Sequence, residues 1–309
     1  MEVVTLLISQ IVIMFLYMIF GFVLFKGKKI SKEGSANMAT LLVWLIIPVV
    51  VVKSFCVVPT QERIVGLLLS IAAAVAAQGV SMLTAHLFFK NRPIDNFAAA
   101  FSNAGFIGIP LVKATVGDEA VFYIAFFVAI LNILQWVYGV AVITNKKMSV
   151  SKSTLVHPLI LGTALGLVLF FTGLGAKLPA VVMNTLSGIS ALNAPLAMLI
   201  MGVYLAQADM KSLWTDKHLY LLSLVRLVLI PVLTLALLWA MQLLIPALNS
   251  TIVMALLIAA IAPVGANVAV YAQLHNKDYV YASKTVVIST LLSLVSMPLI
   301  VLLAQYLLR

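Results

Sequence analysis

The sequence predicts an all-α integral membrane protein in which ten transmembrane helices form a 5+5 inverted repeat. Three observations support this fold class. Hydrophobic residues make up 64% of the 309 residues and charged residues only 9%, whereas soluble domains carry roughly a quarter charged residues. Apolar runs of about 20 residues, enough to cross roughly 30 Å of hydrocarbon, recur along the whole chain. Two of these runs are interrupted by helix-breaking residues at corresponding places in the two halves.

The apolar runs define ten expected spans, and the loops between them are too short to hold a soluble domain. The first span is too long for the apolar part of a signal peptide, so we expect it to be retained. A β-barrel is excluded because its strands would show as short segments of alternating hydrophobicity. The expected spans are residues 3–25, 36–58, 64–89, 95–114, 118–144, 154–174, 187–207, 218–244, 250–275 and 279–308.

The basic residues between the spans predict the orientation of the chain. Loops after odd-numbered spans hold twelve lysines and arginines, and the opposite side holds five. By the positive-inside rule, both termini are expected outside. The net charge of +10 is spread over these loops, so the lipid bilayer is an expected partner and nucleic acid is not. The twelve are Lys26, Lys28, Lys29, Lys32, Lys90, Arg92, Lys146, Lys147, Lys152, Lys211, Lys217 and Lys277, and the five are Lys53, Arg63, Lys113, Lys177 and Arg309.

The ten spans divide into two expected repeats, residues 1–147 and 148–309, with the seam at the basic loop 145–153. Five spans in each half force the halves into opposite orientations. Short internal similarities support the division. "GFVLFKGKKI" at the end of the first span resembles "GLVLFFTGLGAKL" at the end of the sixth, and Pro48 in the second span has a counterpart in Pro195 in the seventh.

The fourth and ninth spans carry "NAGFIGIP" (103–110) and "APVGANVAV" (262–270), which predict broken helices. Proline removes a backbone hydrogen bond, and lipid offers no other partner, so the unwound backbone must pack in protein or line a wet cavity. Matching interruptions in two halves indicate a transporter's binding site, although glycine and small residues also serve helix packing alone. Free helix ends and amide side chains suit an anion such as a carboxylate. The candidate binding residues are Asn103, Gly105, Gly108, Pro110, Pro263, Gly265 and Asn267.

Other polar residues within spans are weaker candidates. Lys284 either supplies a positive charge near the interrupted spans or snorkels to the interface, and Arg226 is expected to snorkel or brace the scaffold. Asn132 and Gln135 lie three residues apart on one helical face, where they either line a cavity or bond between helices. Asn193 is a further candidate.

Several classes of site are not expected. All nine acids lie at or near span ends, so a deep proton relay or a carboxylate cage for a metal is missing. The single cysteine, Cys56, excludes an internal disulfide and a cysteine-rich metal site. No Walker, HExxH or G-x-S-x-G motif occurs. We therefore expect no cofactor, no metal and no enzymatic activity.

The motifs "SNAGFIGIPL" and "APVGANVAVYAQ", together with the ten-span plan, resemble the auxin efflux carrier family. That family includes plant PIN-formed auxin exporters and bacterial permeases for malate or malonate. The resemblance covers essentially the whole chain and implies a fold shared with bile acid–sodium symporters. In that fold the fourth and ninth spans cross within a mobile transport domain beside a scaffold domain, and each domain is built from both repeats.

The resemblance places Asn103 and Pro110 on the asparagine and proline of the first crossover. Plant members have a proline where this chain has Val268, so Pro263 and Gly265 would break the ninth span. That departure weakens the case for auxin as the substrate. The chain also lacks the long central loop of many plant members, which fits a bacterial protein in the inner (plasma) membrane.

The function expected from the residues and the resemblance is secondary transport of small organic anions, as an efflux carrier or permease that works by elevator-type alternating access. Dicarboxylates such as malate or malonate and indole-type monocarboxylates are the candidate substrates. The alternatives are an organic-anion channel and a sodium-coupled symporter of the bile-acid type. The coupling ion, if there is one, could be a proton or sodium. The chain could also form a homodimer.

Overall fold

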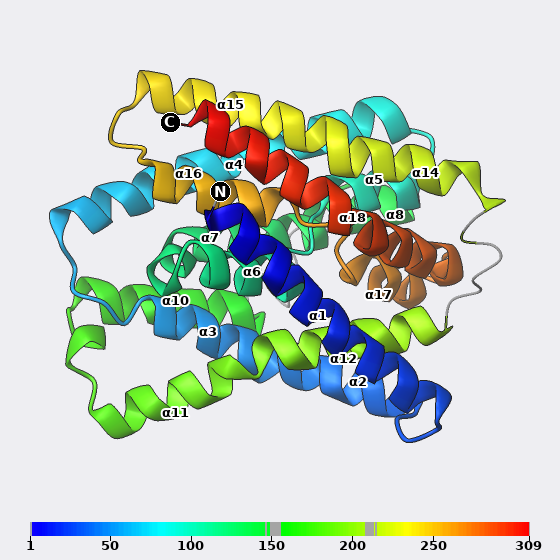
Figure 1. Cartoon of the computed structure of the whole chain (residues 1–309), viewed down its shortest axis with the longest axis horizontal. Helices are drawn as coiled ribbons and strands as arrows, with labels where there is room; N and C mark the ends of the chain where they lie inside the picture. The colour runs from blue at the N-terminus through cyan, green and yellow to red at the C-terminus, as the bar shows by residue number, and fades with distance from the viewer. Residues whose placement is uncertain (1, 146, 149–155, 208–212, 214, 309) are drawn as a thin grey trace.

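The computed structural model describes residues 2–145, 147–148, 156–207, 213 and 215–308 (Figure 1). Within these residues, seven helical stretches are long and apolar enough to cross a membrane, so the chain is a multi-pass membrane protein. They are Thr5–Lys26, Lys32–Ser54, Gln61–Phe89, Asp118–Thr144, Ala180–Gln207, Lys217–Leu244 and Tyr279–Leu307. Shorter apolar helices cover Ala104–Thr115, Pro158–Phe171 and Ser250–Ile261.

The long stretches are subdivided by kinks and wider turns. The α-helices are α1 (Glu2–Lys26), α2 (Lys32–Leu41), α3 (Ile47–Ser54), α4 (Gln61–Phe89), α5 (Pro93–Ala100), α6 (Ile109–Thr115), α7 (Asp118–Leu134), α8 (Val140–Thr144), α10 (Pro158–Phe171), α11 (Ala180–Ala191), α12 (Asn193–Gln207), α14 (Lys217–Leu224), α15 (Ile230–Leu244), α16 (Ser250–Ile261), α17 (Asn267–Leu274) and α18 (Tyr279–Leu307). π-Helical turns cover Leu42–Ile46, Ala104–Gly108, Gln135–Gly139 and Val225–Leu229.

The helices overlap the expected spans, but some borders differ. The second begins at Lys32 because the Ser31 hydroxyl caps it, accepting a hydrogen bond from the Gly34 N–H at 2.9 Å. The seventh begins seven residues earlier than expected, at Ala180. The expected seam at 145–153 lies mostly outside the described residues.

Prolines explain three of the four π-helical turns. Pro48, Pro110 and Pro231 each occupy the second position of the α-helix that follows such a turn. Proline donates no hydrogen bond to the carbonyl four residues earlier and clashes with it, so the preceding turn widens. These widened turns shift side chains relative to a regular helix, and the turns at 42–46 and 104–108 both contribute to the cavity described below.

The helices can be described in two groups, which contact each other where α1 meets α6 and where α3 meets α7. One group holds α1, α2, α3, α10, α11 and α12, and the other holds α4 to α8 and α14 to α18. In the first group the backbones of α1 and α12 approach closely at two glycines. A Cβ at Gly21 would collide with the Leu199 carbonyl, and one at Gly202 would collide with the Met18 carbonyl. In the second group, α16 is buried from Ile252 to Ile261.

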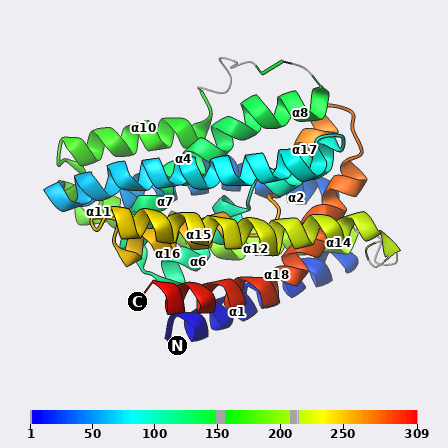
Figure 2. The same cartoon turned by 90° about the horizontal axis from the view of Figure 1, so that it is seen from above.

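The helices run back and forth between two ends of the molecule (Figure 1). α18 contacts α1 across the two groups, and α1 begins at the same end at which α18 finishes (Figure 2). One end carries the loops 27–31, 90–92 and 275–278 and the start of α14, and we call it the basic-loop end. The opposite end carries the loops 55–60, 116–117, 172–179 and 245–249.

Candidate substrate-binding site

The site is built where two helices are interrupted. α5 ends at Ala100, and Phe101 has an extended backbone with φ −118° and ψ 120° before helical geometry resumes at Ala104. In the other segment, residues 262–266 separate α16 from α17 and include Pro263. Both segments that the sequence predicts to be broken are therefore interrupted in the structure.

The two interruptions lie against each other. The Asn103 N–H donates to the Pro263 carbonyl at 2.8 Å, and the Gly265 N–H donates to the Phe101 carbonyl at 3.0 Å. Ser102 and Val264 form an antiparallel bridge. The unwound backbone is thus satisfied by its counterpart, as the membrane interior requires. As a result, the ends of four half-helices meet at one place.

Small residues and a hydroxyl hold this contact. A Cβ on Gly265 would lie 3.1 Å from the Ser102 carbonyl oxygen and 3.3 Å from that of Phe101, so glycine permits the close approach. The Val264 N–H donates to the hydroxyl of Ser289, on α18, at 3.1 Å. Gly108 packs instead against α16, where a Cβ would lie 3.2 Å from the Ala259 Cα.

The carboxyl ends of α5 and α16 are bound by Arg226, a residue that sequence reasoning undervalued. The side chain is 0% exposed and donates to the carbonyls of Ala99, Ala260 and Ala262. The expectation that Arg226 snorkels to the interface is wrong, because its side chain is fully buried, and it braces the two interrupted helices through these carbonyls. An arginine ten residues into an apolar span is costly in lipid and marks a functional position, which is the signal that could have identified it.

The amino ends of the other two half-helices face a cavity of about 820 Å³. Its wall includes Gly105 and Phe106 from the first turn after one break, and Ala266 and Asn267 from the first turn after the other. Helix amino ends carry free N–H groups and a partial positive charge. The cavity therefore meets the electropositive side of the broken helices.

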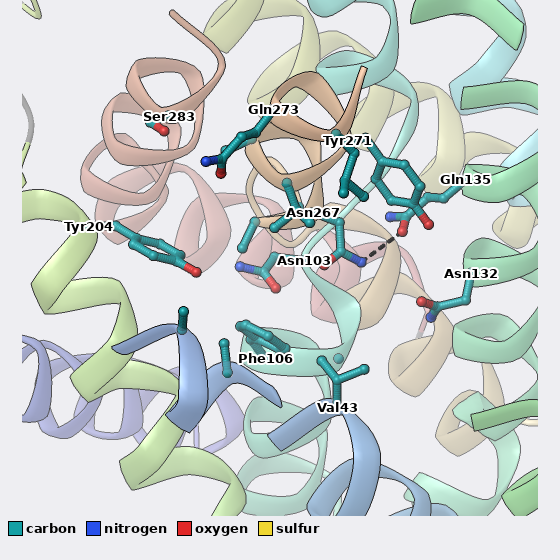
Figure 3. Close-up of a pocket in the computed structure, with 18 of the residues that line it drawn as sticks. Val43, Asn103, Phe106, Asn132, Gln135, Tyr204, Asn267, Tyr271, Gln273 and Ser283 are labelled. Carbon is teal, nitrogen blue, oxygen red and sulfur yellow. Dashed lines mark hydrogen bonds between the residues drawn. The ribbon is translucent and has the colours of Figure 1, made fainter. Parts of the chain in front are cut away.

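Amide side chains extend this donor surface (Figure 3). Asn103 is only 4% exposed, and its Nδ2 has no hydrogen-bond partner among the described residues. The Asn267 Nδ2 donates to the Gln135 Oε1 at 2.8 Å, which orients both groups on the cavity wall. Asn132 also lines the cavity, but its Nδ2 donates to the Val128 carbonyl of its own helix at 2.8 Å.

The charged residues of the cavity wall are all basic. They are Lys32 and Lys284, and no aspartate or glutamate is among the described residues that line the space. Part of the remaining wall is aromatic, from Trp44, Phe106, Trp136, Tyr204, Tyr271 and Tyr279. The cavity thus combines an excess of positive charge with broad apolar surfaces.

The cavity runs from the interruptions toward the basic-loop end. Its outer wall includes Lys32 at the start of α2, Gln207 at the end of α12, Gln273 near the end of α17 and Tyr279 at the start of α18. These positions adjoin the loops rich in lysine. The space is therefore closest to solvent on that side.

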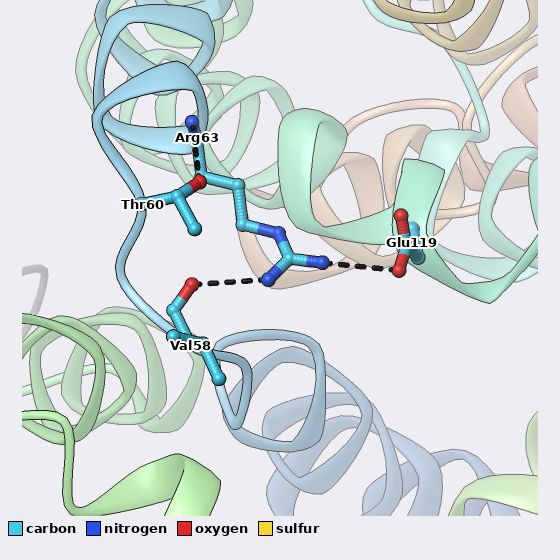
Figure 4. Close-up of polar contacts among 4 residues, drawn as sticks. All are labelled: Val58, Thr60, Arg63 and Glu119. Carbon is cyan, nitrogen blue, oxygen red and sulfur yellow. Dashed lines mark hydrogen bonds and ion pairs between the residues drawn. The ribbon is translucent and has the colours of Figure 1, made fainter.

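The opposite end is held together by ion pairs and aromatic packing. Arg63 donates to the Glu119 carboxylate and to the Val58 carbonyl, each at 3.0 Å (Figure 4). Lys53 lies 3.7 Å from Asp118. Phe55, just after α3, packs edge-on against Phe122 and Phe126 of α7, with ring centroids 5.2 and 6.2 Å apart. Here α3 and α7, from the two helix groups, are in direct contact.

The residues predicted for the site differ in whether they line the cavity. Some of them line the cavity, namely Asn103, Gly105, Gly265, Asn267, Lys284, Asn132 and Gln135. Gly108, Pro110 and Pro263 are not on its wall and shape the backbone instead. Asn193 is buried away from it, with both side-chain polar atoms unpaired within the described chain.

The buried carboxylate of Asp95 already has a hydrogen-bond donor and a basic partner. Asp95, near the start of α5, is 1% exposed. It accepts a hydrogen bond from the Tyr281 hydroxyl at 2.7 Å and lies 2.6 Å from the Arg92 Nε. Among the described residues, no group of three or more His, Cys, Asp and Glu side chains is placed to hold a metal ion.

Broken helices that meet inside a multi-pass membrane protein, beside a cavity, are typical of membrane transporters. The sequence matches the family described as membrane transport protein over residues 6–155 and 146–301. The chain therefore belongs to this family, which is that of the auxin efflux carriers, and is a membrane transporter. Comparison with curated proteins gives no match.

Proposed function

We propose that the protein is a secondary active carrier, an efflux carrier or permease, that transports small organic anions and binds their carboxylate where the two helices are interrupted. One observation carries this proposal. The amino ends of two half-helices and the unpaired Nδ2 of the buried Asn103 converge on one cavity. A carboxylate would accept hydrogen bonds from these groups, and charge-assisted bonds of this kind are the strong ones.

The charge of the cavity supports an anionic ligand. Lys284 makes no ion pair within the described chain, and the lining residues include no acid to neutralise it. A carboxylate on the ligand would supply the missing negative charge. A cation would instead meet helix amino ends and lysines, which disfavours it.

The shape of the cavity supports alternating access. The space reaches the basic-loop end, which the positive-inside rule places in the cytoplasm of a bacterial cell, with both termini outside the inner membrane. The opposite end is packed by Phe55 and Phe122. This arrangement corresponds to an inward-facing state, and a channel would need a path through both ends.

The two helix groups support an elevator-type movement. In this proposal the group with α1, α2, α3, α10, α11 and α12 is the scaffold, and the group with the interrupted helices is the transport domain. Each group draws on both expected repeats, 1–147 and 148–309. The antiparallel pairing of Ser102 with Val264 agrees with repeats of opposite orientation.

Purified protein tests this function in two steps. A thermal-shift screen with malate, malonate and indole-3-acetate, with and without sodium, identifies the acid that binds and whether sodium is coupled. Counterflow of that acid in proteoliposomes then separates the mechanisms. A carrier shows saturable exchange, whereas voltage-driven current without saturable exchange would make the protein an anion channel. Stabilisation by none of these acids, and no exchange, would contradict the proposal.

A further inference from the structure

The binding mode of Arg226 is unusual for a buried charge. Its Nε and Nη2 donate to the Ala262 carbonyl at 3.2 and 2.8 Å, its Nη1 donates to the Ala99 carbonyl at 3.2 Å, and Nη2 also bonds the Ala260 carbonyl. Within the described part of the chain it makes no ion pair. Its partners are instead the carboxyl ends of α5 and α16.

The positive charge of Arg226 is balanced by the partial negative charges of these two helix ends. A helix carboxyl end acts as roughly half a negative charge, so two ends act together as about one. A buried cation without a carboxylate is costly, and the two helix ends supply the compensation. The neighbouring carbonyl, that of Ala100, is satisfied without charge by the Gln78 Nε2 at 2.9 Å.

We propose that Arg226 sets the charge selectivity of the substrate site by cancelling the negative ends of the two broken helices. All four half-helix ends meet at the interruptions, so without Arg226 the negative pair would offset the positive pair. With Arg226 in place, a ligand in the cavity experiences the amino ends alone. This inference rests on the proposed function, because it assigns the origin of the preference for anions.

Arg226 exerts this effect without touching the ligand. Neither Arg226 nor Ala99, Ala260 or Ala262 lines the cavity, whereas Asn103 and Asn267 do. The guanidinium lies on the carboxyl-end side of the interruptions, and the substrate space lies on the amino-end side. Arg226 is therefore a positioning residue that acts through the helix ends.

The test compares the affinity for a carboxylate with that for its neutral amide, because a general loss of packing would weaken both equally. The probes are indole-3-acetate against indole-3-acetamide and malonate against malonamide. Arg226→Gln is expected to lower the acid-to-amide affinity ratio on the order of tenfold while the affinity for the amide stays near the wild-type value. Lys177→Gln, which removes an exposed charge from the loop after α10, should leave the ratio unchanged.

Arg226→Lys provides the second variant in case the glutamine variant does not fold. A buried lysine loses its proton readily whereas arginine does not. The acid-to-amide ratio of Arg226→Lys should fall between pH 6 and pH 9, and the wild-type ratio should change less. The titratable side chains on helices packed against residues 225–229 are common to both proteins, so the wild type corrects for them. They are Asp95, Lys217, His218, Tyr220, Tyr279, Tyr281, Lys284 and Tyr306.

The outcomes separate this inference from the proposed function. An unchanged ratio in Arg226→Gln, or equal losses for acid and amide, would overturn the role of Arg226 and leave anion transport standing. A ratio in Arg226→Lys that follows the wild type at both pH values would also overturn it. If none of malate, malonate and indole-3-acetate binds the wild-type protein, the proposed function fails first and the inference falls with it.

Discussion

The side-chain amide of Asn267 donates a hydrogen bond to the Gln135 Oε1 at 2.8 Å, which joins the first turn of α17 to the π-helical turn after α7. Gln135 is 1% exposed and lies on the cavity wall. A glutamate at this position would keep an acceptor for Asn267 but add a negative charge. The pair therefore offers a way to change the charge of the site with little change in its shape.

Gln135→Glu is expected to reduce the affinity for the substrate acid about tenfold or more at pH 8, because like charges repel in a poorly solvated site. Burial raises the pKa of such a carboxyl group, so affinity should recover at pH 5.5 as the glutamate becomes neutral. Thermal shift at both pH values measures this. Gln242→Glu, near the opposite end where Gln242 bonds to Ser250, is the matched control. Equal affinity of Gln135→Glu and wild type at pH 8 would contradict the proposed charge of the site.

Asn103→Ala should abolish most of the stabilisation by the acid while leaving the stability of the free protein nearly unchanged. The Nδ2 of Asn103 has no partner within the described chain, so its removal breaks no internal hydrogen bond of that group. A bond to a charged group contributes roughly 1.5–3 kcal/mol, or tenfold and more in affinity. Asn193→Ala is the control, since Asn193 is also buried and unpaired but lies off the cavity. Equal behaviour of the two variants would count against the site.

Lys284→Gln should lower the rate of counterflow at low substrate concentration, with a KM raised about threefold to tenfold, because one positive charge leaves the cavity wall. The rate at saturation should change less. Lys177→Gln, which removes an exposed charge at the other end, is the matched control. A KM that is the same in Lys284→Gln and wild type would remove Lys284 from the substrate path.

Gly265→Ala should destabilise the protein by about 1–3 kcal/mol, as overpacking typically does. The new methyl group would lie 3.1 Å from the Ser102 carbonyl oxygen, and backbone atoms cannot move aside as a flexible side chain can. Gly188→Ala is the control, since a Cβ there meets nothing within 4 Å and alanine favours a helix. Thermal unfolding of the two variants checks the difference. A variant Gly265→Ala as stable as wild type would show that the two interruptions do not pack closely.

The sequence predicts the positions of the interruptions well, because glycine and proline act locally. "NAGFIGIP" and "APVGANVAV" fall on the unwound residues and the turns beside them. The backbone roles of Gly108, Pro110 and Pro263 could not be told from ligand contact by sequence, since that depends on which side of the helix meets the cavity. Asn193 illustrates the same limit: it is polar and within a span, yet it lies away from the cavity.

Arg226 shows why other parts of the site could not be predicted. Its partners Ala99 and Ala262 lie 127 and 36 residues away in the chain. No local sequence pattern predicts that two helix ends will meet at one guanidinium group. The cavity wall likewise depends on Tyr204 and Gln207, which come from the other helix group. Such contacts follow from tertiary packing.

The elevator proposal predicts that joining α3 to α7 stops transport. Phe55 and Phe122 pack at the closed end, and in this proposal they belong to the scaffold and the transport domain. In a background with Cys56→Ser, cysteines at positions 55 and 122 joined by a short bifunctional thiol reagent should abolish counterflow. Binding of the acid should persist, because the cavity stays open at the other end. Undiminished counterflow in the joined protein would contradict relative movement of these helices.

The most direct measurement is a cryo-EM structure of the protein bound to the acid that stabilises it most. The account predicts density for the carboxylate within hydrogen-bonding distance of the Asn103 Nδ2, beside the amino ends that begin at Ala104 and Asn267. Density for the acid elsewhere, with the space between the interrupted helices left to water, would contradict the central claim.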